Sequence, residues 1–177
     1  MTNLTNPGTR EDGNAVLTAL AGKYMTFKLS HEEYGLEILK VREIIGLMDI
    51  THVPRTPEFV RGVVNLRGKV IPVVDLRLKF AMAKTEATDQ TVIIVVQYSF
   101  GTTDLTMGIL VDEVVEVLDI AADQIEPPPT FGSASADTSF ILGVGKADKR
   151  MIFLLDIGRV LTADELARVS AAPNGSA

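Results

Sequence analysis

The sequence contains no cysteine among its 177 residues, which excludes disulfides, thiol catalysis and thiolate metal sites. Basic residues are scarce, since 17 Lys and Arg stand against 23 Asp and Glu, a formal net charge of −6. Nucleic-acid binding needs a concentrated basic face, so the charge argues against that class. Long hydrophobic runs are also missing: the longest aliphatic run, 92–96, is far shorter than the ~20 residues of a membrane span.

Catalytic patterns are absent as well. The chain has two histidines, His31 and His52, and neither has a second His or a carboxylate at metal-site spacing. It contains no G-x-S-x-G motif, no P-loop and no dinucleotide-binding glycine motif. We therefore expect no catalytic residue, no metal and no cofactor. Asp75 and Asp156 each follow a predicted buried strand, and we expect them to cap the next helical turn.

The sequence is instead rich in short β-branched segments. An alternating segment at 24–29 and apolar runs at 63–66, 69–74 and 91–98 predict strands, with a turn at Arg67-Gly68. Further strands are expected at 105–111, 114–118, 139–145 and 150–155. Many short strands with glycine-containing turns favour small barrels or a sandwich.

An internal repeat organises these strands. VREIIGLMDI (41–50) aligns with VDEVVEVLDI (111–120) at an offset of 70, which pairs Glu43 with Glu113. GVVNLRGKVIPVVDL (62–76) aligns with GVGKADKRMIFLLDI (143–157) at an offset of 81. We infer two homologous β-units of about 60 residues each, and we expect a partner groove at the seam between them.

The chain divides around these units. The first residues are rich in Thr, Asn and Gly, and Thr162 and Glu165 have the spacing of a helix capping box. We therefore predict a flexible arm (1–22), a first β-barrel subdomain (23–90), a second one (91–161), a short C-terminal helix (162–170) and a disordered tail (171–177). Glu11 and Asp12 precede the apolar stretch 15–21 where a signal peptide would be basic, so we expect a cytoplasmic protein.

The segment VPRTPEFVRGVVNLRGKVIPVVDLRLKF (53–80) resembles the signature of the CheW family, the coupling proteins of bacterial chemotaxis. It has a Pro-x-x-Pro approach, an RGV-x-NLRG turn and an IPV-V-DLR strand exit, in that order. The resemblance implies an all-β fold of two packed five-stranded barrels of the Src-homology-3 type, with exchange of terminal segments allowed. It also implies a non-catalytic adaptor that joins the cytoplasmic tip of methyl-accepting chemoreceptors to the regulatory domain of the histidine kinase CheA, in arrays at the membrane.

The resemblance further implies three contact surfaces. The receptor-binding groove corresponds to Val41, Glu43, Gly62, Asn65 and Arg67. The kinase-binding surface corresponds to Ile50, Thr51 and Arg61. The contact that closes rings corresponds to Glu126, Thr130 and Phe131, and here Glu126 and Thr130 stand where a basic and an acidic residue are expected.

Arg67 also stands out on residue physics alone. It lies between two strongly apolar strands, and its repeat counterpart is Asp148, so the cation belongs to one unit only. A solvated hairpin-tip cation is one interpretation and a partner contact is the other. Because the resemblance places Arg67 and Glu43 together in the receptor-binding groove, it implies that they lie close enough to pair.

An alternative function is a CheW-like scaffold for a receptor–kinase pathway outside chemotaxis, such as twitching or surface sensing. An enzyme built on a small barrel is a third reading. Receptor and kinase genes nearby would favour chemotaxis, pilus genes would favour twitching, and turnover in a hydrolase or transferase screen would favour the enzyme.

Phe131 is predicted to be a partner anchor rather than a core residue, because it follows three prolines and precedes a small, polar segment. Phe131→Ala should keep near-normal thermal stability and binary kinase affinity but lose higher-order rings. A buried phenylalanine would instead cost roughly 3–5 kcal/mol on truncation. A large fall in stability, or intact arrays, would contradict the prediction.

Overall fold

The computed structural model describes residues 18–100, 102–128, 140–161 and Glu165. Its strands are β1 (Gly22–Leu29), β2 (Glu32–Glu37), β3 (Val41–Gly46), β4 (Val60–Leu66), β5 (Lys69–Asp75), β6 (Val92–Phe100), β7 (Thr103–Val111), β8 (Glu113–Ile120), β9 (Ile125–Glu126), β10 (Ile141–Ala147) and β11 (Arg150–Leu155). The short helices are η1 (Ile38–Lys40), α2 (Leu76–Lys79) and η2 (Ala122–Gln124). Among the described residues, no helix is long and apolar enough to cross a membrane.

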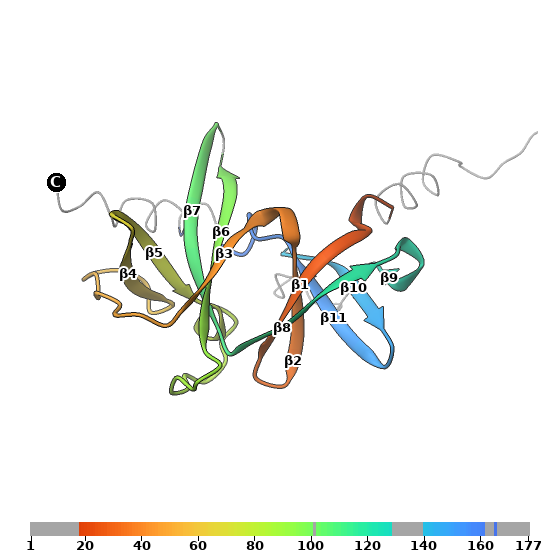
Figure 1. Cartoon of the computed structure of the whole chain (residues 1–177), viewed down its shortest axis with the longest axis horizontal. Helices are drawn as coiled ribbons and strands as arrows, with labels where there is room; N and C mark the ends of the chain where they lie inside the picture. Colours follow the sequence, from red (N-terminus) through yellow and green to blue (C-terminus); the bar gives the residue numbers. More distant parts are fainter. Residues whose placement is uncertain (1–17, 101, 129–139, 162–164, 166–177) are drawn as a thin grey trace, which may run out of the picture.

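The strands form two packed sheets, which confirms the predicted β-rich class (Figure 1). The six-stranded sheet has the order β8-β1-β2-β11-β10-β9, and the five-stranded sheet has the order β3-β6-β7-β5-β4. Neighbouring strands are antiparallel, except that β5 runs parallel to β7 and β11 runs parallel to β2. The same pairing pattern therefore occurs in both sheets, with β9 added to one of them.

The two sheets do not coincide with the ranges 23–90 and 91–161. The β1–β2 hairpin lies in the sheet of β8–β11, and the β6–β7 hairpin lies in the sheet of β3–β5. Each repeat thus places its first hairpin in the sheet of the other repeat. The predicted ranges 23–90 and 91–161 therefore describe the two repeats and not the two sheets. After β2, η1 leads the chain directly into β3 of the other sheet.

Strand pairing corrects one half of the repeat alignment. Val95 pairs with Gly108, which lies beside β5, and Thr26 pairs with Gly35, which lies beside β11. Val95 and Thr26 are therefore equivalent positions. Val95 pairs with Glu43 and Thr26 pairs with Glu116, with one bulged residue before each glutamate. The counterpart of Glu43 is therefore Glu116 and not Glu113.

The alignment failed at this strand for a physical reason. Apolar residues stand on both faces of β3 and β8, so the apolar pattern does not fix the register. The other block, at an offset of 81, is confirmed: the closing pair Leu66↔Lys69 of the first hairpin corresponds to Ala147↔Arg150 in the second.

A shared core holds the sheets together. The largest cluster of buried side chains takes residues from both sheets, including Phe27 and Leu36 from one and Ile94 and Ile109 from the other. Each sheet also has a smaller cluster of its own. Among the described residues the seam is lined by these packed side chains, and the groove described below lies within one sheet.

Two aspartates act as capping groups at the connections: Asp75 caps a helix, as predicted, and Asp156 caps a turn that does not continue into a described helix. Asp75 Oδ1 accepts a hydrogen bond from Arg77 N (2.9 Å) at the start of α2, and Asp156 Oδ1 accepts one from Gly158 N (3.0 Å). Asp112, between β7 and β8, accepts from Ser30 N (2.8 Å) and from an Arg77 guanidinium nitrogen (2.6 Å). This carboxylate links the β1–β2 turn of one sheet to α2 of the other.

The chain ends are described only in part. Residues 1–17 of the predicted arm and the whole predicted tail lie outside the described residues. Of the predicted helix 162–170, only Glu165 is described; it is helical, and its carboxylate accepts hydrogen bonds from Lys79 Nζ at 2.7 and 2.8 Å.

The hairpin exchange predicts that neither repeat folds by itself. Residues 18–90 and 91–165 expressed separately should lack a monomeric β-rich state, because each fragment leaves a sheet without its two central strands. Mixing the fragments should restore the far-ultraviolet spectrum and the chemical-shift dispersion of the intact chain. A monomeric, well-dispersed single fragment would contradict the prediction.

Candidate functional site

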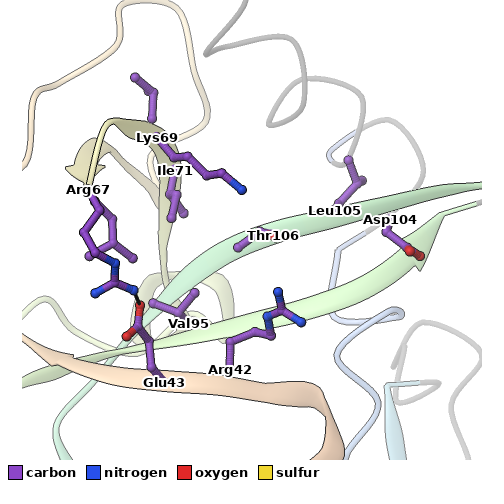
Figure 2. A pocket seen from close by; sticks show the side chains of 11 residues that line it. Arg42, Glu43, Arg67, Lys69, Ile71, Val95, Asp104, Leu105 and Thr106 are labelled. Carbon is purple, nitrogen blue, oxygen red and sulfur yellow. Dashed lines mark hydrogen bonds and ion pairs between the residues drawn. The ribbon is translucent and has the colours of Figure 1, made fainter.

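A groove of about 500 Å³ lies on the five-stranded sheet (Figure 2). Its residues come from β3, the β4–β5 hairpin, β6 and β7. The apolar part consists of Leu66, Val70, Ile71, Val95 and Leu105. The polar part consists of Arg42, Glu43, Arg67, Lys69, Asp104 and Thr106. An apolar lining with charges of both signs suits a protein side chain better than a nucleic acid or a metal.

Arg67 occupies a strained position at the tip of the β4–β5 hairpin. The two-residue turn Arg67-Gly68 has positive φ at both positions, 52° and 87°, which is the signature of a type I′ turn. Asn65 Oδ1 accepts a hydrogen bond from Gly68 N (2.9 Å) and stabilises the turn. Such turns favour Asn, Asp or Gly, and the equivalent Asp148 (φ 56°) follows that preference. Arg67 does not.

The Arg67 guanidinium pairs with the carboxylate of Glu43 on β3, as predicted (Figure 2). The Arg67 side chain is 71 % exposed and that of Glu43 is 31 % exposed. Exposed ion pairs contribute only about 0–1 kcal/mol to folding. A left-handed backbone at a residue with a long side chain costs on the order of 1–3 kcal/mol. Folding stability therefore does not explain an arginine at this position.

The other residues of the expected receptor set lie apart from the groove. Val41 is half-buried on β3 and packs against the shared core. Gly62 is buried with φ 142°, and a Cβ there would stand 2.1 Å from the carbonyl oxygen of Thr51. That glycine allows Thr51 and Val63 to exchange two backbone hydrogen bonds of 2.8 Å. The structure thus brings Glu43, Asn65 and Arg67 together and places Gly62 elsewhere.

The expected kinase set forms one neighbourhood around β4. Thr51 is exposed and bridges to Val63, and Ile50 packs against the core of the five-stranded sheet. An Arg61 guanidinium nitrogen donates to Asp75 Oδ2 at 3.0 Å, and the Asp75 side chain is only 6 % exposed. Arg61 is therefore held by a buried carboxylate, whereas Thr51 is open to solvent.

The expected ring contact is described only at Glu126. This residue is exposed on β9, and its carboxylate accepts a hydrogen bond from Lys146 Nζ on β10. Thr130 and Phe131 lie outside the described residues.

Sequence reasoning missed several exposed apolar residues. Ile44 and its counterpart Val117 are 41 % and 50 % exposed, and Val70 and its counterpart Met151 are 51 % and 60 % exposed. The corrected repeat would have identified these two pairs, because each occupies the same register position in both sheets. Leu39, in η1, is 84 % exposed, and no repeat signal marks it.

The six-stranded sheet carries an ion triad where the five-stranded sheet has its groove. Guanidinium nitrogens of Arg150 donate to Glu33 Oε2 (2.9 Å) and to Glu116 Oε2 (3.2 Å). Burial lowers the pKa of Arg150, but the hydrogen bonds and negative charges of Glu33 and Glu116 outweigh it and raise the pKa above its ordinary value. No group of three or more His, Asp or Glu in the described part of the chain could hold a metal.

The fold and the groove together define a binding module with two sheets that share strands between repeats. A family model described as the CheW-like domain matches residues 23–165. Chemotaxis protein CheW of Klebsiella aerogenes is 41 % identical over 162 residues, which cover 89 % of this chain and 95 % of the relative. Chemotaxis protein CheW of Bacillus subtilis is 32 % identical, with 86 % and 93 % covered.

A solved structure has a similar fold. The crystal structure of the scaffolding protein TtCheW from Thermoanaerobacter tengcongensis matches with a TM-score of 0.71 and 36 % identity, over 82 % of this chain and 96 % of that one. The chain belongs to the CheW family.

The strained turn gives a stability prediction. Arg67→Asn and Arg67→Ala both remove the ion pair with Glu43, but asparagine tolerates the left-handed backbone better than alanine. Arg67→Asn should therefore be more stable than Arg67→Ala by about 0.5–1 kcal/mol in the free energy of unfolding, measured by urea denaturation. Equal stability of the two variants would argue against strain at this residue.

Proposed function

We propose that the protein is a non-catalytic adaptor that couples methyl-accepting chemoreceptors to the histidine kinase CheA in chemotaxis. Membership of the CheW family supports this proposal, and so do the names of the relatives, two chemotaxis proteins and a scaffolding protein. The observation that carries it is the groove whose rim holds Arg67 in a strained turn beside Glu43. A residue kept against its backbone preference is a candidate for function.

The receptor tip is the proposed occupant of this groove. Val70 is half-exposed beside the buried Ile71 and Val95, so an apolar side chain of the partner finds contact area there. The charged rim then orients the partner, since complementary charges favour one docking direction. The adaptor would work in the cytoplasm, recruited to receptor arrays at the membrane.

The kinase is the proposed partner of the surface around Ile50, Thr51 and Arg61. The exposed Thr51 offers a hydroxyl, and Arg61 is held by an ion pair with the buried carboxylate of Asp75. We assign the second contact, which would close rings, to Glu126, Thr130 and Phe131. Glu126 already has an internal cation in Lys146, so the proposed contact relies on the aromatic side chain.

No feature of the described fold or of the groove favours the alternative function, a scaffold outside chemotaxis, over the chemotaxis adaptor. The relatives that match with high coverage include chemotaxis proteins from two distant bacteria. We therefore retain the chemotaxis proposal.

Arg67→Ala should weaken binding to the soluble cytoplasmic fragment of a chemoreceptor by at least ~30-fold, because truncation of an arginine hot spot costs about 2 kcal/mol or more. The melting temperature should hardly change, since the lost ion pair is exposed. Isothermal titration calorimetry and thermal denaturation on the same preparation measure both quantities.

Arg159→Ala is the matched control. Its side chain is 65 % exposed and pairs with Asp156, so an exposed ion pair is lost here too. Arg159 follows β11 of the six-stranded sheet and does not line the groove on the five-stranded sheet. This variant should bind the receptor fragment like the wild type. Normal binding by Arg67→Ala would contradict the proposed site.

A further inference from the structure

The repeat allows the groove to be compared with its own copy. Lys69 and Arg150 are the first residues of β5 and β11 and occupy the same register position. Glu33 stands two residues before Gly35 on β2, and Thr106 stands two residues before the equivalent Gly108 on β7, so Thr106 occupies the position of Glu33. Glu116 corresponds to Glu43, as shown above. Both sheets thus have a cation (Lys69 or Arg150) and a glutamate (Glu43 or Glu116) at equivalent positions. The third position holds Thr106 in one sheet and Glu33 in the other.

In the six-stranded sheet this arrangement is complete. Arg150 lies between two carboxylates, and the side chain of Glu33 is only 14 % exposed. The cation therefore has both of its anionic partners within the chain. Two charge-assisted hydrogen bonds hold it there.

In the five-stranded sheet the same arrangement lacks one carboxylate. Thr106 stands at the position of Glu33, and Glu43 is turned to Arg67. The Lys69 side chain extends over the groove towards Thr106 (Figure 2). Within the described part of the chain, its ammonium group has no hydrogen-bond or ion-pair partner.

We propose that the partner supplies the missing carboxylate: an Asp or Glu side chain of the bound protein pairs with Lys69 beside Thr106, where Glu33 stands in the other sheet. This inference rests on the proposed receptor groove and specifies the chemistry of its occupant. The Thr106 hydroxyl is placed to donate a hydrogen bond to the same carboxylate.

The charge of the groove favours a single carboxylate over a phosphate group. Arg67 and Glu43 neutralise each other, and Arg42 and Lys69 stand against Asp104, so the lining has one positive charge in excess. A monoanion balances that charge as Glu33 does in the copy, whereas a dianion would exceed it. The apolar lining around Ile71 and Val95 favours a side chain presented by a folded protein over a free acid.

Thr106→Glu tests the proposal, because it supplies the carboxylate from within the chain and so competes with the partner. Binding of the soluble cytoplasmic chemoreceptor fragment to the full-length variant should weaken at least tenfold. Thr106→Gln has the same shape as Thr106→Glu and no charge, so it should weaken binding at least threefold less than Thr106→Glu does. Lys69→Gln should also weaken binding at least tenfold and should reduce the dependence of the affinity on salt concentration.

The outcomes separate this inference from the function on which it rests. If Arg67→Ala weakens binding but Thr106→Glu and Lys69→Gln do not, the proposed partner carboxylate at Lys69 is refuted, and the proposed receptor groove is retained. Equal losses for Thr106→Glu and Thr106→Gln would show that size alone matters, which also refutes it. Normal binding by Arg67→Ala as well would overturn the receptor groove itself. Thermal denaturation of each variant excludes unfolding as the cause.

Discussion

The packing of the two exchanged hairpins against each other is the constraint on which the rest of the structure depends. Phe27 and Leu36 from one hairpin and Ile94 and Ile109 from the other are buried in one cluster that neither sheet forms alone. A β-unit of about 60 residues buries a smaller fraction of its surface than a larger domain and is only marginally stable, so sharing the core adds burial that one unit lacks. The groove depends on the same contact, because β6 and β7 line one side of it and also carry this core.

Polar groups act at the points where the sheets connect. Asp112 accepts from the backbone of Ser30 and from the Arg77 side chain, so it joins a turn of one sheet to the helix of the other. Asp75 both caps α2 and holds Arg61. Through this second contact Asp75 ties Arg61, a residue of the expected kinase surface, to the start of α2.

Local spacing in the sequence predicted the class of fold, most strands and the capping hydrogen bonds of Asp75 and Asp156. The Arg67–Glu43 pair joins two distant strands and was predicted from the family resemblance instead. It did not predict which hairpin joins which sheet, since strand pairing over long distances leaves no local pattern. The offset of β8 was wrong because apolar residues on both faces hide a shift of register. Gly62 was assigned to the receptor groove by resemblance. The structure shows that a side chain there would collide with the Thr51 carbonyl oxygen and so prevent the backbone pairing of Thr51 with Val63.

The exchange of hairpins also bears on how such a chain can evolve. In a tandem duplication whose copies fold separately, one copy can decay or be deleted while the other keeps its function. Here each sheet takes its central strands from the opposite half of the gene, so deletion of either half removes strands from both sheets. Natural selection must therefore retain both halves, while single surface positions such as 69 and 150, or 106 and 33, remain free to diverge towards different roles.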